Sequence, residues 1–263
     1  MSGLCKILLT ISYDGTAYHG WQNQNNAVSV QEKVEEALSG VFAVKSLVKI
    51  TGASRTDTGV HALDQKASFF IEKNLVKIPL INLPLVLNSK LPPDIKVTDA
   101  RFVGESFHPR YNAKEKTYRY QILNSKYPNP MLNNYAWHVH YKLNMSEMKK
   151  AARLMVGTFN FSAFCASGSS AKTFVRSVYE VKINEEPESS LLTVFVRGNG
   201  FLYNMVRIMA GTLMYTGCGK IDAEKIPEII KSGDRTLAGI TAPPQGLTLY
   251  KVSYTAPNQS VIY

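Results

Sequence analysis

The chain has 263 residues, of which 45% are hydrophobic, and it carries a formal net charge of +10. This length and composition suit one large domain or two of about 130 residues, and they exclude a fragment or a disordered tail. The positive excess lies in the second half. Residues 1–107 hold 11 basic and 10 acidic side chains, whereas residues 108–263 hold 19 basic and 10 acidic side chains. Such a field attracts a polyanion, with nucleic acid first and an anionic membrane surface second, although a generally basic cytosolic protein would show the same totals.

The cysteines and the N-terminal segment indicate the compartment. Cys5, Cys165 and Cys218 are odd in number and far apart, which suggests neither a disulfide framework nor a cysteine-rich zinc site. Residues 1–14 are typical of a strand that carries Lys6, not of the apolar core of a signal peptide. No apolar run approaches the ~20 residues of a membrane span. We therefore expect a soluble, cytoplasmic protein.

Hydrophobic periodicity predicts the elements of the first half. A strand over residues 4–12 is followed by a helix that begins at a capping box, with Ser29 as the cap and Glu32 three residues later. The apolar face of this helix is Val30, Val34, Ala37, Leu38 and Val41, at helical spacing. The chain then continues with strands over 47–53 and 62–71, an apolar, partly helical stretch over 79–89 interrupted by Pro84, and a strand over 95–103. The order is β-α-β-β-α-β.

The second half repeats this order. It opens with a strand over 116–123, in which Tyr118, Tyr120 and Ile122 share one face, and an excursion through 135–141 follows. The remaining predicted elements are a helix over 146–155, strands over 174–183 and 191–197, a helix over 202–215 and a strand over 247–254. The sequence therefore predicts an α/β (α+β) fold of two ferredoxin-like halves, residues 1–107 and 108–263. Their antiparallel sheets would join edge to edge, with helices on one face and a central basic cleft on the other.

Residues 51–62 form a connecting loop between two predicted strands, and this loop concentrates Thr, Ser, Gly and one carboxylate, Asp57. Loops on a rigid sheet often display catalytic groups, but Asp57-Thr58-Gly59 is also ordinary turn chemistry, and composition alone favours the turn. The same three residues could belong to an aspartic protease, whose site needs two such carboxylates sharing a proton. This chain contains only one Asp-Thr-Gly segment.

A longer motif distinguishes these alternatives. Residues 52–62, Gly-x-x-Arg-Thr-Asp-x-Gly-Val-His-Ala, strongly resemble the motif of the tRNA pseudouridine synthase A family. Three further segments resemble the family in the same order. They are Tyr-Asp-Gly-Thr-x-Tyr-His-Gly-Trp-Gln at 13–22, Phe-His-Pro-Arg-Tyr-x-Ala-x-x-Lys-Thr-Tyr-Arg-Tyr at 107–120, and Phe-Leu-Tyr-Asn-Met-Val-Arg-Ile-Met-x-Gly-Thr-Leu at 201–213, with Ala-Pro-Pro-x-Gly-Leu at 242–247. The resemblance thus extends along the whole chain and implies the pseudouridine synthase fold.

The resemblance implies an isomerase that needs no cofactor and no metal. Pseudouridine formation breaks the N1–C1′ bond, turns the uracil and rejoins it through C5, without a change of redox state. Asp57 matches the catalytic aspartate of the family, and a carboxylate can attack an electrophilic carbon or remove a proton and later leave. The sequence leaves open whether it attacks C1′, attacks uracil C6 or acts through a glycal.

Two further residues resemble the catalytic groups of the family. Burial beside the base would raise the pKa of Asp57, so a neighbouring cation is needed, and Arg207 matches the arginine that pairs with this carboxylate. The alternative makes Arg207 a surface residue of an amphipathic helix. Tyr118 matches the tyrosine that stacks on the flipped base, and its hydroxyl could assist proton removal from C5. The alternative is a core tyrosine of a strand.

Five basic residues are predicted to bind the RNA. Arg55 resembles the arginine that approaches the space vacated by the flipped base, with a phosphate contact as the alternative. Arg110 and Lys116 alternate with tyrosines, a pattern suited to phosphate contacts and stacking, and Lys172 and Arg176 match a basic run of the family. The segment before this run, residues 165–171, departs from the usual family pattern.

The other candidate sites are weaker. His138 and His140 share a strand face and could hold a metal, but packing or surface roles are favoured because no third ligand is evident. His19 and His61 are expected to brace loops, and Asp14 to fix a turn. The resemblance implies a homodimer that acts on uridines 38 to 40 in the anticodon arm of tRNA. A non-catalytic tRNA-binding protein or RNA chaperone of the same fold is the alternative.

Overall fold

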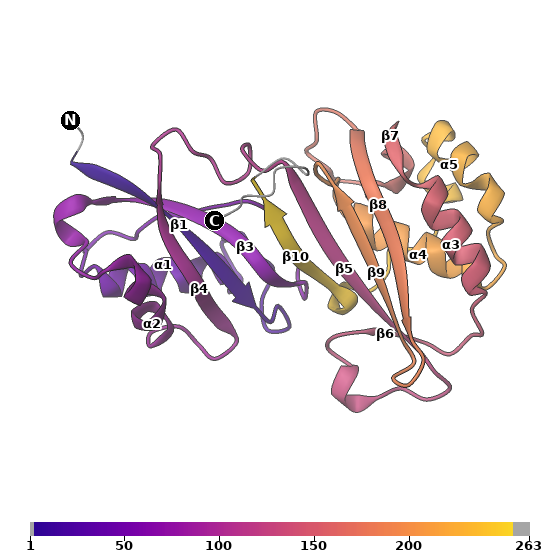
Figure 1. The fold of residues 1–263 in the computed structure, drawn as a ribbon, viewed down its shortest axis with the longest axis horizontal. Helices are drawn as coiled ribbons and strands as arrows, with labels where there is room; N and C mark the ends of the chain where they lie inside the picture. The colour runs from indigo at the N-terminus through magenta and orange to yellow at the C-terminus, as the bar shows by residue number, and fades with distance from the viewer. Residues whose placement is uncertain (1–2, 255–263) are drawn as a thin grey trace, which may run out of the picture. The chain divides into compact units, whose positions relative to one another are not determined.

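The computed structural model describes residues 3–254 and divides the chain into two compact units. Among the described residues, unit 1 contains residues 3–114 and 249–254, and unit 2 contains residues 115–248. Both units combine helices with mostly antiparallel strands (Figure 1). The chain is therefore a mixed α/β protein, as predicted.

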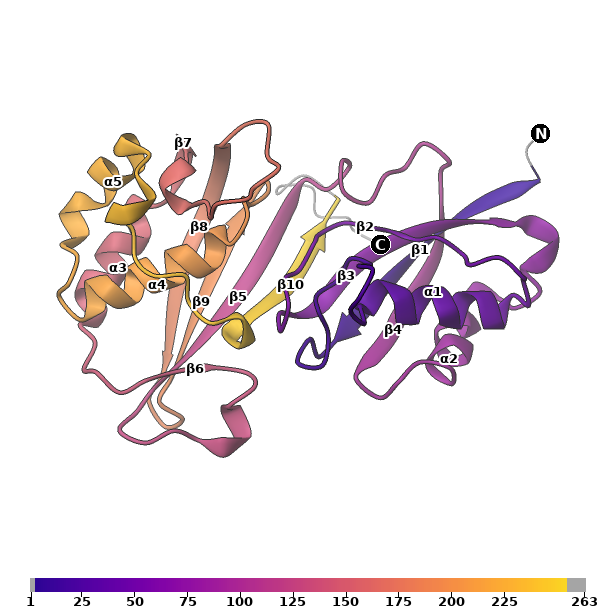
Figure 2. The same cartoon turned by 180° about the vertical axis from the view of Figure 1, so that it is seen from behind.

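Unit 1 has the predicted β-α-β-β-α-β order. Its elements are β1 Leu4–Tyr13, α1 Val30–Val41, β2 Thr51–Gly52, β3 His61–Glu72, η1 Lys73–Leu75, η2 Leu80–Asn82, α2 Leu83–Asn88 and β4 Ile95–Val103. The strands pair in the order β4-β1-β3-β2, and every pair is antiparallel. Helix α1 lies across these strands (Figure 2). This is the strand order of a ferredoxin-like unit.

Helix α1 begins where the sequence predicts. The Ser29 hydroxyl accepts a hydrogen bond from Glu32 N, and the Glu32 carboxylate accepts one from Ser29 N. This reciprocal pair satisfies two backbone donors that a helix start leaves without partners. Four of the five predicted core residues, Val30, Val34, Ala37 and Leu38, are buried. The apolar face thus anchors the helix to the sheet.

Two predictions for unit 1 were wrong in detail. The strand expected over 47–53 is reduced to β2, since side chains of α1 take its backbone donors: Val48 N donates to Ser39 Oγ, and Ile50 N donates to Glu35 Oε1. Pro84 does not interrupt the helical stretch. It lies in the first turn of α2, where the missing N–H of proline removes no helical hydrogen bond.

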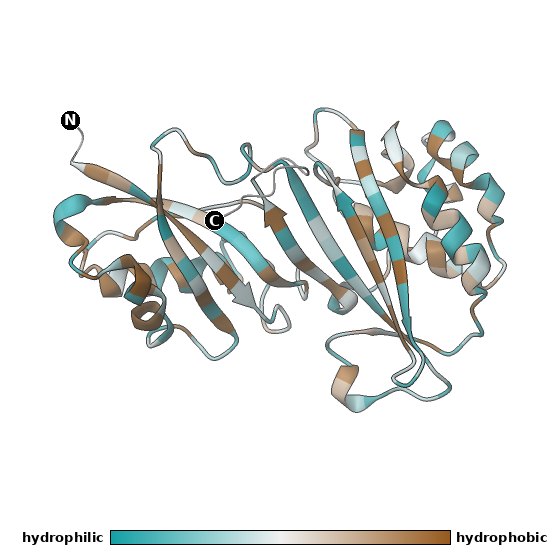
Figure 3. Cartoon of the chain, in the orientation of Figure 1, coloured by the Kyte–Doolittle hydropathy of each residue, from teal (hydrophilic) through white to brown (hydrophobic). Residues whose placement is uncertain are grey.

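Unit 2 contains a further set of mostly antiparallel strands. Its elements are β5 Glu115–Asn124, η3 Pro130–Leu132, β6 Trp137–Val139, α3 Met145–Leu154, β7 Gly157–Asn160, η4 Ser162–Phe164, β8 Val175–Glu186, β9 Leu191–Gly198, α4 Met205–Gly217, η5 Ala223–Lys225, α5 Ile226–Ser232, η6 Arg235–Leu237 and η7 Pro244–Gly246. The strands pair in the order β5-β9-β8-β7, and β6 pairs with β5 in parallel. Hydrophobic and hydrophilic residues alternate in bands along β8 (Figure 3), and Val178, Val181 and Ile183 of this strand are buried. Strand β7 and helix α5 were not predicted.

The last strand, β10 Leu247–Ser253, ends in unit 1. Val252 N donates to Asp64 Oδ2 at 2.8 Å, and Lys114 N donates to Ser253 O at 2.8 Å. The C-terminal part of the strand is thus tied to the unit that contains the chain start. Within the described part of the chain, no helix is long and apolar enough to cross a membrane.

Candidate active site

The loop that carries Asp57 is held from the side of β3 by a glutamine. Gln65 is fully buried, and its side chain forms two hydrogen bonds with the backbone of Ser54: Ser54 N donates to Oε1 at 3.2 Å, and Nε2 donates to Ser54 O at 2.6 Å. Ala53 N also donates to Lys66 O at 2.7 Å. The start of the loop therefore has a fixed path.

The segment over 13–22 holds the same loop from the other side. The hydroxyls of Tyr13 and Thr56 are hydrogen bonded at 2.7 Å, Trp21 N donates to Thr56 O at 3.1 Å, and Gly59 N donates to Tyr18 O at 3.3 Å. Two of the sequence motifs, separated by about 30 residues of chain that include helix α1, are thus joined to each other by hydrogen bonds.

Asp57 lies in the turn that follows. Its carbonyl accepts a hydrogen bond from Val60 N at 3.1 Å, and Gly59 has a φ of 75°. Thr56 and Val60 are buried, whereas Asp57 is half-buried. The carboxylate is therefore displayed from a loop whose flanking residues are fixed, as a catalytic group requires.

Two of the residues expected to brace this region, Asp14 and His61, do so, whereas His19 is exposed and its bracing role stays a prediction. Asp14 Oδ1 accepts hydrogen bonds from Thr16 N at 2.9 Å and Thr16 Oγ1 at 2.6 Å, which confirms the predicted turn. His61 is buried, and its Nδ1 lies 3.0 Å from Gly15 N and 3.1 Å from Asp14 Oδ1. Tyr18 donates to Asp94 Oδ1 at 2.7 Å, and burial together with this carboxylate raises the pKa of Tyr18.

In unit 2, Arg207 lies in the first turn of α4 and is held by two oxygens. Its Nε donates to Ala242 O at 2.7 Å, and its Nη1 donates to Asn204 Oδ1 at 2.8 Å. Asn204 precedes the helix with a φ of 58°, in the left-handed region that asparagine tolerates better than most residues. The guanidinium is thus oriented by the two motifs over 201–213 and 242–247.

Tyr118 lies on β5 and is 7% exposed. Its ring contacts Phe201 edge to face, with centroids 5.3 Å apart and planes at 88°. The next tyrosine of this strand face, Tyr120, is fully buried and donates its hydroxyl to Pro243 O at 2.8 Å. The ring of Tyr118 is therefore mostly buried and is held against Phe201, as expected of a core tyrosine.

The five basic residues predicted to bind RNA differ in exposure. Arg55, Arg110 and Lys172 are exposed. Arg176 is half-buried, and its Nη1 donates to Thr173 O at 3.0 Å and Val175 O at 2.7 Å. Lys116 is only 8% exposed, because it lies on the same strand face as Tyr118 and Tyr120.

Some contributing residues were not predicted. Gln65 and Asn204 hold the candidate catalytic groups, and the signal that could have found them is their position inside or next to the motifs. His138 and His140 have ring centroids 6.5 Å apart, and His138 Nε2 is hydrogen bonded to Ser125 O at 2.9 Å. Within residues 3–254, no three His, Cys, Asp or Glu side chains are grouped to hold a metal ion.

A loop with a fixed backbone that carries Asp57, together with the exposed Arg55 two residues earlier, is typical of an enzyme that acts on an anionic substrate. The sequence profile of the family "tRNA pseudouridine synthase" matches residues 9–112 and 151–255. The chain belongs to this family, whose enzymes are isomerases, and it has the pseudouridine synthase fold. It is 53% identical to tRNA pseudouridine synthase A of Thermoanaerobacter sp. (strain X514) over 94% of this chain and 99% of the relative.

Two further proteins named tRNA pseudouridine synthase A are similar to this chain over the same share of its length. The proteins of Acetivibrio thermocellus and Geotalea daltonii are 48% and 44% identical to this chain, and each alignment covers 94% of this chain and 99% of the relative. The resemblance deduced from the four sequence motifs is thereby confirmed.

Proposed function

We propose that this chain isomerises uridine to pseudouridine in the anticodon arm of tRNA, at positions 38 to 40, and that Asp57 carries the chemistry. Family membership supports the reaction. The catalytic role of Asp57 is supported by the hydrogen bonds through which Gln65 and the 13–22 segment fix the Asp57 loop from both sides. An enzyme gains most from a reactive group that is already held in place before the substrate binds.

The reaction exchanges one bond for another. The N1–C1′ bond breaks, the uracil turns, a C5–C1′ bond forms, C5 loses its proton and N1 gains one. Asp57 as an ionised carboxylate can attack C1′, attack C6 or take a proton from the sugar, and each route returns the carboxylate unchanged. No oxidant or reductant enters this balance.

Arg207 is proposed to pair with the Asp57 carboxylate. A planar guanidinium with several N–H groups can donate to Ala242 O and Asn204 Oδ1 and still donate to a carboxylate. Such a partner would keep the acid ionised against the desolvation that the bound base imposes. Tyr118 is proposed to stack on the flipped uracil and, through its hydroxyl, to assist proton removal from C5.

The remaining basic residues are proposed to hold the RNA. Arg55 would approach the space vacated by the flipped base, and Arg110, Lys172 and Arg176 would contact phosphates in a basic cleft. Lys116 stays a prediction, and its burial makes it the weakest of the five. Residues 1–107 would supply the catalytic loop and residues 108–263 most of the RNA-binding surface. The protein would act as a cytoplasmic homodimer, since one small chain presents limited surface to a tRNA.

The experiment measures pseudouridine formation in an unmodified tRNA transcript with wild-type protein, Asp57→Asn and Asp99→Asn. Asp99 is an exposed aspartate of β4 and serves as the matched control. We expect product at positions 38 to 40 with the wild type and Asp99→Asn, and none with Asp57→Asn, which should still bind tRNA. A wild type that binds tRNA but forms no product would establish the alternative, a non-catalytic tRNA-binding protein. An active Asp57→Asn protein would refute only the assignment of Asp57 as the catalytic residue.

A further inference from the structure

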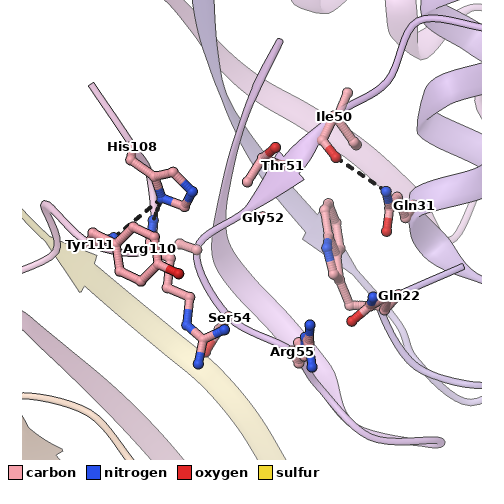
Figure 4. A pocket seen from close by; sticks show the side chains of 12 residues that line it. Gln22, Gln31, Ile50, Thr51, Gly52, Ser54, Arg55, His108, Arg110 and Tyr111 are labelled. Atoms are coloured by element: carbon pink, nitrogen blue, oxygen red, sulfur yellow. Dashed lines mark hydrogen bonds between the residues drawn. The ribbon is translucent and has the colours of Figure 1, made fainter. Parts of the chain in front are cut away.

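A pocket of about 300 Å³ lies within unit 1, beside the start of the Asp57 loop (Figure 4). Residues from four segments of the chain line it: residues 21–22, Gln31, residues 50–55, and His108, Arg110 and Tyr111. The lining holds two exposed arginines, Arg55 and Arg110, and no acidic side chain. Pockets of about 300 Å³ are at the small end of ligand sites, so this one suits a single nucleotide and not a duplex. The positive lining favours an anionic ligand.

One wall of the pocket is an exposed aromatic platform. Tyr111 is 77% exposed, and its ring lies on the His108 ring with centroids 4.2 Å apart and planes at 34°. His108 Nδ1 accepts a hydrogen bond from Arg110 N at 3.1 Å, which fixes the turn that presents Tyr111. Burial and the charges of Lys6 and Arg110 lower the pKa of His108, in agreement with a neutral ring that accepts at Nδ1. An exposed tyrosine on a fixed support is what a nucleobase needs for stacking.

The other wall contains two glutamine side chains, of which one has unused hydrogen-bonding groups. The Gln31 amide is occupied, because Nε2 donates to Glu35 Oε1 and Ile50 O, and Oε1 accepts from Asn23 N. Gln22, which is exposed, forms no side-chain hydrogen bond to any residue within 3–254. Its amide can therefore donate to and accept from the edge of a base.

We propose that this pocket binds one unpaired nucleotide of the RNA substrate, different from the uridine that is isomerised. The base would stack on Tyr111, its edge would meet Gln22, and its phosphate would meet Arg110. Asp57 does not line the pocket, so a nucleotide held there is not in position for the reaction. Arg55 lines the pocket and is two residues from Asp57, so the bound nucleotide would be near the target along the RNA. The identity of the RNA rests on the proposed function.

The test measures the affinity of the full chain for a set of tRNA transcripts that each lack one base in the anticodon loop. With wild-type protein we expect one non-target position at which loss of the base weakens binding about tenfold, the size of one stacking interaction. Tyr111→Ala should weaken binding of intact tRNA by a similar factor and show no further loss at that position. Tyr111→Phe should behave like the wild type, because phenylalanine keeps the stacking surface.

Tyr127→Ala is the matched control. Tyr127 is 70% exposed, has a lysine nitrogen, Lys126 Nζ, 5.1 Å from its ring, and lies outside the pocket. With Tyr127→Ala, removal of the base at the position identified with the wild type should still weaken binding about tenfold. Equal penalties in wild type and Tyr111→Ala at every position would overturn the proposal, and so would a penalty confined to the target uridine. Because the readout is binding, it decides the matter even if no pseudouridine is formed, an outcome that would refute only the proposed function.

Discussion

Gly20 places its bare Cα against the carbonyl of Thr56, the residue immediately before Asp57. Its φ is 87°, and a Cβ at this position would overlap the Thr56 oxygen. The backbone of the 13–22 segment can approach the Asp57 loop this closely only because residue 20 has no side chain. The position of the candidate catalytic residue therefore depends on a glycine more than 30 residues earlier in the chain.

Gly20→Ala should therefore reduce both stability and turnover. The unfavourable φ and the overlap should lower the free energy of unfolding by about 2 kcal/mol or more, and displacement of Asp57 should reduce kcat. Gly40→Ala in α1 is the control, because no atom lies within 4 Å of its added Cβ and alanine favours a helix. Urea unfolding and pseudouridine formation measure the two effects. A Gly20→Ala protein as active as Gly40→Ala would contradict this role.

Arg207→Ala should reduce kcat about 100-fold or more while changing the Kd for tRNA by less than about threefold. The reason is that an arginine oriented toward the catalytic carboxylate acts on the reaction and contributes little to binding of the whole RNA. Arg153→Ala, an exposed arginine at the end of α3, should change neither quantity. An equal fall in kcat and in affinity would count against the pairing with Asp57.

Two substitutions of Asn204 separate its backbone conformation from its hydrogen bond with Arg207. It occupies a left-handed backbone conformation and also accepts a hydrogen bond from Arg207. Asn204→Gly keeps the conformation and removes the acceptor, so kcat should fall with little change in Tm. Asn204→Ala should show the same loss of kcat together with a lower free energy of unfolding, by about 1–2 kcal/mol, because alanine is strained there. If both variants retain wild-type kcat, Asn204 does not position Arg207.

Glu35 is a fully buried carboxylate that supports one wall of the pocket. It accepts hydrogen bonds from Ile50 N at 3.0 Å, Gln31 Nε2 at 2.9 Å and Asn23 Nδ2 at 3.0 Å. Glu35→Gln would turn an amide NH₂ toward these donors and should lower the free energy of unfolding by about 2–3 kcal/mol. Its neighbour Glu36 is exposed, so Glu36→Gln should cost less than about 0.5 kcal/mol. Chemical denaturation of both variants checks this, and equal effects would be evidence against the network.

His108 should make the stability of unit 1 depend on pH. Burial and the neighbouring Lys6 and Arg110 lower its folded pKa below the unfolded value of about 6.5. Its contribution is therefore complete above about pH 6.5 and is lost as the pH falls through the lower folded pKa, where protonation removes the Nδ1 acceptor. The difference in unfolding free energy between wild type and His108→Gln should be constant from pH 7 to 8 and should shrink toward pH 5. A difference that grows toward acid would contradict the assignment.

The sequence by itself determined the elements whose signals are local, and it identified the family through four motifs. The capping box and apolar face of α1 lie within one stretch of chain, so periodicity was enough to find them. The strand expected over 47–53 failed because Glu35 and Ser39, on a different element, take its backbone donors. The sequence predicted the strand that contains Lys116, but it did not reveal that this lysine is buried on the face of Tyr118.

Only the tertiary structure decided which segments hold the candidate catalytic groups. Thr56 O, Ala242 O and the Ser54 amide are the partners that fix Asp57 and Arg207, and all three are backbone atoms. Backbone donors and acceptors are the same in every residue except proline, so a sequence carries no mark of which one a distant side chain will use. The pocket is a further case, because its four lining segments come together only when the chain folds.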